Sequence, residues 1–94
     1  MDAEIVENSK LHRFELPLGG DDMALAYYKI DDGNRVVLTH TEVPYQYSGR
    51  GIGSRLAKGV FDILRKTGRK AVVKCPFMGA WISRHPDYND VIDG

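Results

Sequence analysis

The chain has 94 residues, 13 basic and 13 acidic side chains and a formal net charge of zero, so we expect residues 1–94 to form one small domain with a modest core. No apolar run approaches the ~20 residues of a membrane span, and the acidic start lacks the basic and apolar segments of a signal peptide. The single cysteine cannot form an internal disulfide, which agrees with a reducing compartment, so we expect a cytoplasmic protein. One cysteine cannot form a cysteine zinc site and the three histidines have no ligand spacing, so we expect no metal.

The first half of the chain has the composition of antiparallel strands. The separators at residues 17–21 and 31–34 are rich in residues that favour turns, and the second is short enough for a tight hairpin. Residues 3–7 are a candidate for a further edge strand. Three segments rich in β-branched and aromatic side chains are the predicted strands: residues 11–16, 23–30 and 35–43.

The second half predicts a helix, a strand and a second helix. Apolar spacing indicates a helix over residues 53–67, with Gly68 as its C-terminal cap. A short strand at residues 70–75 follows closely, and such a crossover places it parallel to the last strand of the first half. Pro76 suits the first turn of a helix over residues 77–84. The expected fold class is therefore α/β, with a mixed, mainly antiparallel sheet, one parallel pair and two principal helices.

A glycine-rich segment with the sequence SGRGIGS, residues 48–54, runs directly into the first helix. Its alternating glycines free the backbone N–H groups to approach an anion, and the helix adds the positive end of its dipole. Residues 50–74 carry eight basic side chains against one acid, which agrees with an anion site. The alternative is a glycine-rich turn without a ligand. We call residues 49–54 the glycine loop.

Four short segments in this order resemble the GNAT superfamily of N-acetyltransferases, most closely its short single-domain branch that binds acetyl-CoA. They are residues 40–44 (HTEVP), 49–53 (GRGIG), 75–77 (CPF) and 85–88 (HPDY). The resemblance implies that acetyl-CoA binds where the two central strands splay apart, with its pyrophosphate in the glycine loop. The residues implied in binding acetyl-CoA are Val43, Ser48, Gly49, Arg50, Gly51, Ile52, Gly53, Ser54, Arg55 and Cys75.

Candidate catalytic residues stand at the ends of the two central strands. Cys75 precedes a helix that starts with proline, and a helix N-terminus favours the thiolate; the alternative is a small buried apolar side chain. His40 and Glu42 alternate along their strand, so we expect them on the same face as Val36 and Leu38, emerging from the core into a cleft. Either side chain could take the proton of an attacking amine. The alternative is a core histidine beside a surface glutamate.

The sequence departs from the family at two positions. Ser48 stands where the family usually has Arg or Gln, so charge must come from Arg50 or Arg55. Trp81 is expected near the place of a tyrosine thought to protonate the departing CoA sulfur, and an indole cannot serve as that acid.

The predicted function is transfer of an acetyl group from acetyl-CoA to an unidentified amine, by direct attack in a ternary complex. One alternative is a protein that binds acetyl-CoA or CoA with little turnover. A further alternative is a small nucleic-acid-binding domain, which would need aromatic side chains among the basic ones. Phe61 is the only aromatic residue within the first predicted helix. Binding of nucleic acid is therefore the weaker expectation. A solvated helix face also explains the basic residues.

Overall fold

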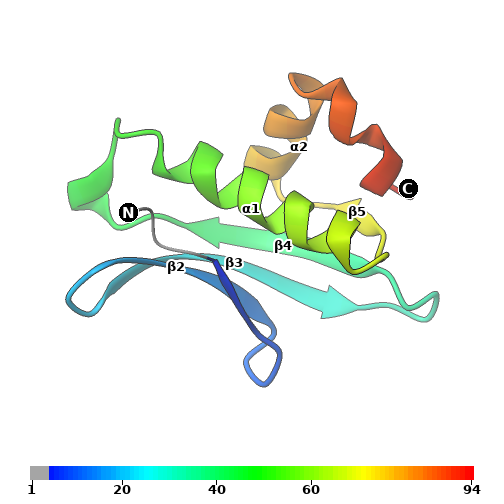
Figure 1. The fold of residues 1–94 in the computed structure, drawn as a ribbon, viewed down its shortest axis with the longest axis horizontal. Coiled ribbons are helices and arrows are strands. Elements are labelled where there is room, and N and C mark those ends of the chain that lie inside the picture. Colours follow the sequence, from blue (N-terminus) through cyan, green and yellow to red (C-terminus); the bar gives the residue numbers. More distant parts are fainter. Residues whose placement is uncertain (1–4) are drawn as a thin grey trace.

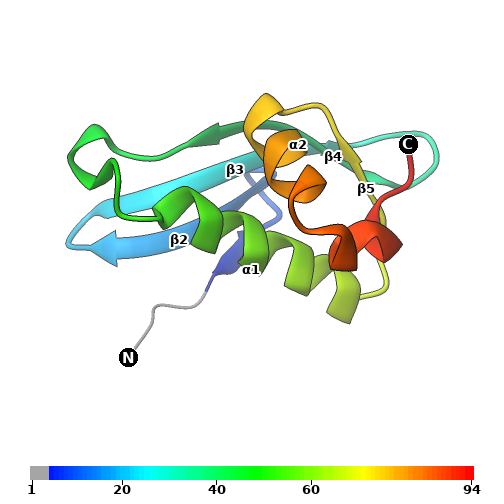
Figure 2. The same cartoon turned by 90° about the horizontal axis from the view of Figure 1, so that it is seen from above.

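A computed structural model describes residues 5–94 as a five-stranded sheet with both main helices on one face (Figures 1 and 2). Neighbouring strands run antiparallel except β4 and β5, which are parallel. This confirms the predicted α/β fold and its parallel pair. The strands follow the order β1 (Val6–Asn8), β2 (Arg13–Gly19), β3 (Asp22–Ile30), β4 (Val36–Glu42) and β5 (Ala71–Val73). The helices are α1 (Ile52–Lys66) and α2 (Pro76–Ser83), and two short 3-10 helices are η1 (Tyr45–Tyr47) and η2 (Pro86–Val91).

The core lies between the sheet and the helices. Ala24 and Ala26 on β3 are fully buried, and their small side chains let α1 lie close to the sheet. The apolar stripe of α1 faces the same core and supplies Leu56, Ala57, Val60, Phe61 and Leu64. Among residues 5–94, no helix covers the opposite face of the sheet (Figure 1). We call that side, which carries Leu25 and Tyr27 of β3, the open face.

The end of α1 follows the local sequence closely. Gly68 has a φ of 71°, the left-handed conformation that glycine adopts without strain. The Gly68 N–H donates to the Arg65 carbonyl at 3.2 Å, and the Arg69 N–H donates to the Leu64 carbonyl at 2.9 Å. This is a Schellman motif, and it confirms Gly68 as the residue that ends the helix. The chain turns there directly into β5.

The β2 strand is displaced from its predicted position. It begins at Arg13 and continues through Pro17 to Gly19. The predicted separator at residues 17–21 is therefore wrong for residues 17–19, and the turn is confined to Gly20 and Asp21. Among the described residues, 5–94, strand β1 pairs with β2 only as far as Glu15, so nothing in this range needs a hydrogen bond from the missing N–H of Pro17 on that side. Of the predicted edge strand at residues 3–7, residues 3 and 4 lie outside the described part, and β1 occupies Val6–Asn8.

A β-bulge interrupts the pairing of β3 with β4. Tyr28 lies opposite Leu38, but the next residue, Tyr27, lies opposite His40. Thr39 is therefore the extra residue, and its hydroxyl donates to the Tyr27 carbonyl at 3.3 Å. An extra residue reverses which side chains point to which face along the rest of the strand.

The bulge corrects the predicted placement of His40 and Glu42. Both lie on the open face, opposite Tyr27 and Leu25, rather than in the row of buried residues earlier on β4. Thr41 takes the place on the helix side, opposite the buried Ala26. Simple alternation along the sequence cannot reveal this exchange.

Glu7 connects the N-terminal strand to the loop after α1. The Arg69 guanidinium donates to both Glu7 oxygens, at 2.7 and 3.0 Å, and the Tyr28 hydroxyl donates to one of them at 2.5 Å. The Arg69 hydrogen bond, supported by that of Tyr28, holds the pKa of Glu7 below its ordinary value. The negative form of Glu7 therefore stabilises the fold.

Replacing Glu7 with glutamine is expected to lower the free energy of unfolding at pH 7 by about 1–2 kcal/mol, a range reduced for partial exposure. Because the pKa is lower in the folded state, the contribution is present above the unfolded pKa of about 4.3 and is lost as pH falls through the folded pKa. The difference between parent and Glu7→Gln in urea unfolding should therefore shrink below about pH 4. Asp21→Asn, at an exposed turn position, is the control. A difference independent of pH would contradict this role.

Candidate active site

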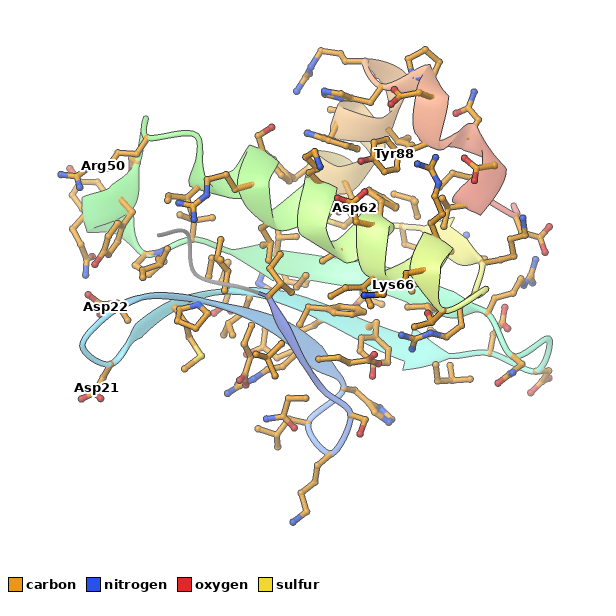
Figure 3. All side chains as sticks on the ribbon, in the orientation of Figure 1. Asp21, Asp22, Arg50, Asp62, Lys66 and Tyr88 are labelled. Atoms are coloured by element: carbon orange, nitrogen blue, oxygen red, sulfur yellow. The ribbon has the colours of Figure 1, made fainter. Side chains whose placement is uncertain are left out.

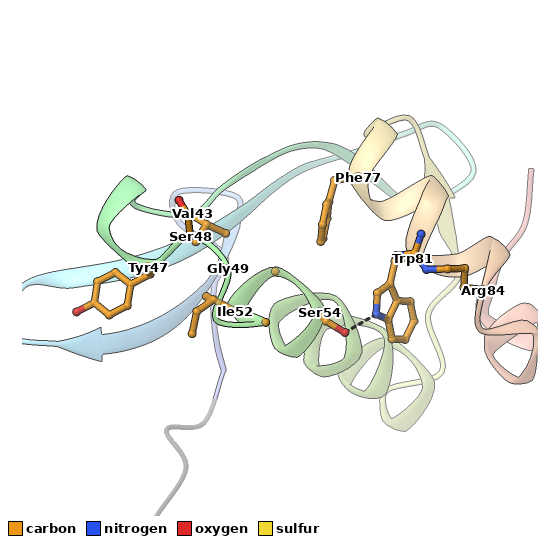
Figure 4. A pocket seen from close by; sticks show the side chains of 11 residues that line it. Val43, Tyr47, Ser48, Gly49, Ile52, Ser54, Phe77, Trp81 and Arg84 are labelled. Atoms are coloured by element: carbon orange, nitrogen blue, oxygen red, sulfur yellow. Dashed lines mark hydrogen bonds between the residues drawn. The ribbon is translucent and has the colours of Figure 1, made fainter.

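A cavity of about 350 Å³ lies between the glycine loop and α2 (Figure 4). The end of β4 and the loop lie on one side, and the aromatic side chains of α2 lie on the other. The residues that line it are Val43, Tyr47, Ser48, Gly49, Gly51, Ile52, Gly53, Ser54, Phe77, Trp81 and Arg84. Seven of the ten residues predicted to contact acetyl-CoA are among them: Val43, Ser48, Gly49, Gly51, Ile52, Gly53 and Ser54.

The glycine loop presents unpaired backbone donors to this cavity. Gly49 and Gly51 have φ values of 76° and 71°, in the left-handed region that disfavours other residues. The first hydrogen bond of α1 joins the Arg55 N–H to the Gly51 carbonyl at 3.1 Å. Within residues 5–94, the N–H groups of residues 49–54 donate to no other residue. Free N–H groups at the start of a helix form a site for an anion.

Gly53 brings the start of α1 against α2. A Cβ atom at Gly53 would lie 2.6 Å from Cζ of Phe77, closer than real contacts allow. Phe77 is 40% exposed as a residue and borders the cavity. The absence of a side chain at residue 53 therefore sets the width of the cavity beside the loop.

Trp81 is fixed by contacts on several sides. Its Nε1–H donates to the Ser54 Oγ at 2.9 Å (Figure 4), and its ring stacks on Phe61 at 5.5 Å and His85 at 3.8 Å between centroids. Only 2% of the residue is exposed. Because the Ser54 Oγ accepts a hydrogen bond from the indole N–H, the hydroxyl proton of Ser54 is free to donate into the cavity.

Cys75 lies at the point where β4 and β5 part. The last paired residues of these strands are Leu38 and Val73, and the N–H groups of Lys74 and Cys75 both donate to the Leu38 carbonyl at 3.0 Å. Beyond that point β4 continues without β5 as its neighbour. The Cys75 Sγ lies 3.7 Å from the Thr41 Oγ1, and the residue is 4% exposed. The structure therefore brings Thr41 to Cys75, a pairing that the bulge creates.

His40 and Glu42 form a pair on the open face. The His40 Nε2 lies 3.1 Å from the Glu42 Oε2, and the His40 ring stacks on Tyr27 at 6.0 Å. Their neighbour Thr41 points to the other side, toward Cys75. The predicted catalytic residues are thus divided between the two faces of the sheet, on either side of the point where the strands separate.

The predicted cations of the loop are not among the residues that line the cavity. The Arg50 guanidinium lies over the Tyr47 ring at 5.7 Å, at the outer end of the molecule in Figure 3, and Arg55 is exposed on α1. Arg84, at the C-terminal cap of α2, lines the cavity instead, and it was not predicted from the sequence. Phe77, Trp81 and Arg84 recur at i, i+4 and i+7, so this helical spacing could have placed Arg84 beside the aromatic residues.

Ion pairs neutralise part of the basic run at residues 50–74. One of the acidic partners, Asp62, accepts a further hydrogen bond from the Tyr88 hydroxyl, and this bond joins η2 to α1 (Figure 3). These contacts favour a structural role for the cations concerned over a nucleic-acid surface. The pairs are Lys58 with Asp62 at 2.8 Å, Arg65 with Asp90 at 2.5 Å and Arg69 with Glu7 at 2.7 Å.

In residues 5–94, no group of three His, Cys, Asp or Glu side chains is placed to hold a metal ion. No helix in this range has the length and apolar character needed to cross a membrane.

Comparisons with known proteins agree with this geometry. A family model described as GCN5-related N-acetyl-transferase matches residues 13–91. Protein NATD1 of Danio rerio is 36% identical over 87 residues, covering 88% of this chain and 79% of that protein. The human protein of that name is 35% identical over 83 residues, covering 86% and 74%.

A solved structure has the same fold. The solution structure of a GCN5-like protein from Staphylococcus aureus superposes with a TM-score of 0.73 and 26% identity, covering 99% of this chain and 90% of that one. Fold, family model and relatives confirm the resemblance seen in the sequence. The chain belongs to the GCN5-related N-acetyltransferase family.

Proposed function

We propose that this protein binds acetyl-CoA in the cavity beside α2 and transfers the acetyl group to an amine. The observation that carries the proposal is the row of unpaired N–H groups at residues 49–54, which borders this cavity. These donors fit the pyrophosphate of CoA, because several N–H groups and the helix dipole act together on one anion. Family membership supports acyl transfer as the reaction.

The walls of the cavity suit the arm of CoA between its phosphates and its sulfur. Val43 at the end of β4 and Phe77 and Trp81 on α2 supply apolar surface beside the loop. From there α2 leads back to its first turn, where Cys75 and Thr41 lie at the separation of the strands. We place the thioester near these two side chains, with the polar Thr41 hydroxyl and Cys75 thiol as part of the wall.

The acceptor amine must lose a proton before or during attack on the thioester. Glu42 and His40 lie on the open face next to Thr41, so an amine that approaches from that face would meet them. Either group could accept the proton directly or through a water molecule. The proposed reaction is direct attack in a ternary complex, in which binding supplies proximity and orientation.

A second function, binding of acetyl-CoA or CoA with little turnover, has its own support. The Trp81 N–H is already donated to Ser54, and an indole does not release a proton to a departing thiolate. A steady-state assay for free CoA, run with a panel of small amines and with peptides, separates the two functions.

Mass spectrometry of purified protein tests the proposal. Native spectra should show bound CoA or acetyl-CoA, and denaturation should release it. If calorimetry with added acetyl-CoA shows no saturable binding either, the proposed function is wrong.

Cys75→Ser is expected to keep acyl transfer within about threefold of the parent, because direct attack needs no covalent acetyl group on this residue. Intact-mass and peptide spectra after incubation with acetyl-CoA should show no increment at residue 75. Cys75→Ala serves as the comparison without a polar group. A stable increment on Cys75, lost together with activity in both variants, would instead establish an acetyl-cysteine intermediate.

A further inference from the structure

Arg84 is the residue that follows the last turn of α2. It lines the cavity opposite the glycine loop, beside Trp81 (Figure 4). Its backbone N–H donates to the Trp81 carbonyl at 3.1 Å, which fixes where the side chain begins. Within residues 5–94, its guanidinium has no ion-pair partner. A cation is thus held at the edge of the cavity without an internal carboxylate to neutralise it.

The glycine loop itself contributes no cation to the lining of the cavity. Ser48 hydrogen-bonds through its Oγ to the Tyr45 carbonyl at 2.6 Å, and it carries no charge. Arg50 lies over the ring of Tyr47, which lines the cavity, but Arg50 itself is not among the lining residues. An anion seated on the loop would therefore meet neutral N–H donors on one side and Arg84 on the other.

We propose that Arg84 binds the pyrophosphate of CoA from the α2 side, opposite the glycine loop. This inference rests on the proposed function. A guanidinium offers a planar pair of N–H donors that suits phosphate oxygens, and such charge-assisted bonds are stronger than neutral ones. The carbonyl end of α2 would otherwise repel a phosphate, and the positive charge of Arg84 offsets that partial negative charge.

The length of α2 agrees with this assignment. Arg84 stands nine positions after Cys75, and at a rise of 1.5 Å per position the two residues lie roughly 13 Å apart along the helix axis. The first turn of α2 borders the separation of β4 and β5, where we place the thioester. Further along the helix, Trp81 donates to Ser54 of the glycine loop, and Arg84 lines the same cavity three residues later. The last turn of α2 therefore also borders the loop where we place the pyrophosphate.

Calorimetry with CoA and with dephospho-CoA, which lacks the 3′-phosphate, tests the proposal. Arg84→Gln should weaken binding of both ligands by about tenfold or more, and by similar factors, because the pyrophosphate is common to them. Arg84→Lys should fall between parent and Arg84→Gln, since it keeps the charge but loses the paired donors. Lys66→Gln, an exposed cation on α1 away from the cavity, is the matched control. The melting temperatures of the parent and of all three variants should be equal, because Arg84 and Lys66 are both exposed.

Two results would overturn the assignment while leaving the proposed function in place. Equal affinities of parent and Arg84→Gln for CoA would show that Arg84 makes no contact. A loss for CoA but not for dephospho-CoA would move the contact to the 3′-phosphate. Absence of CoA binding by the parent would instead remove the proposed function and this inference with it.

Discussion

Replacing Gly53 with valine is expected to weaken CoA binding by about thirtyfold or more while the protein remains folded. A Cβ atom at this position would lie 2.6 Å from Cζ of Phe77, so either the ring or the new side chain must enter the cavity. The Gly53 N–H is also one of the donors that we assign to the pyrophosphate. A loss of about 2 kcal/mol in binding free energy corresponds to this factor.

Calorimetry with CoA measures the effect, and circular dichroism checks the fold. Gly79→Ala is the matched control, because a Cβ at Gly79 on α2 meets only Val73 Cγ1, at an ordinary 3.9 Å. Gly53→Ala should show a smaller loss than Gly53→Val. If Gly53→Val is well folded and binds CoA as tightly as the parent, the loop does not hold the pyrophosphate.

Replacing Trp81 with alanine is expected to lower the free energy of unfolding by about 3–5 kcal/mol, the usual cost of removing a large buried aromatic side chain. Small domains have total stabilities of about 5–15 kcal/mol, so this variant should be marginal at 37 °C. The residue is 2% exposed and stacks on both Phe61 and His85. Its loss would separate α2 from α1.

Urea unfolding followed by circular dichroism provides the measurement. Trp81→Phe keeps an aromatic ring but loses the hydrogen bond to Ser54, and it should cost about 1–2 kcal/mol. A Trp81→Ala variant within 1 kcal/mol of the parent would show that the contacts between the two helices contribute little to stability.

The features predicted correctly from the sequence are those that local chemistry determines. Gly68 ends α1 because only a left-handed residue fits there, and Pro76 starts α2 because its missing N–H is harmless in a first turn. The glycine loop was recognisable because its glycines immediately precede an apolar helical pattern. The parallel pairing of β4 and β5 followed from the general handedness and length of strand-helix-strand connections.

The features that were missed depend on contacts between distant segments. The bulge at Thr39 exists only in the register of β4 against β3, and it moved His40 and Glu42 to the open face. Pro17 could join a strand because, in the part of the chain that the structure describes, β1 pairs with β2 only as far as Glu15. Glu7, the ion-pair partner of Arg69, lies 62 residues earlier in the chain. A count of charges along the sequence therefore overstated the basic surface.

The most direct test of the account is a titration of isotope-labelled protein with CoA, followed through the backbone N–H signals. We predict that the signals of residues 49–54 show the largest shifts and saturate together, because their N–H groups would gain hydrogen bonds to phosphate. The signals of Arg84 and Phe77 should move in the same transition. Saturable CoA binding that leaves residues 49–54 unshifted would contradict the central claim that the glycine loop holds the pyrophosphate.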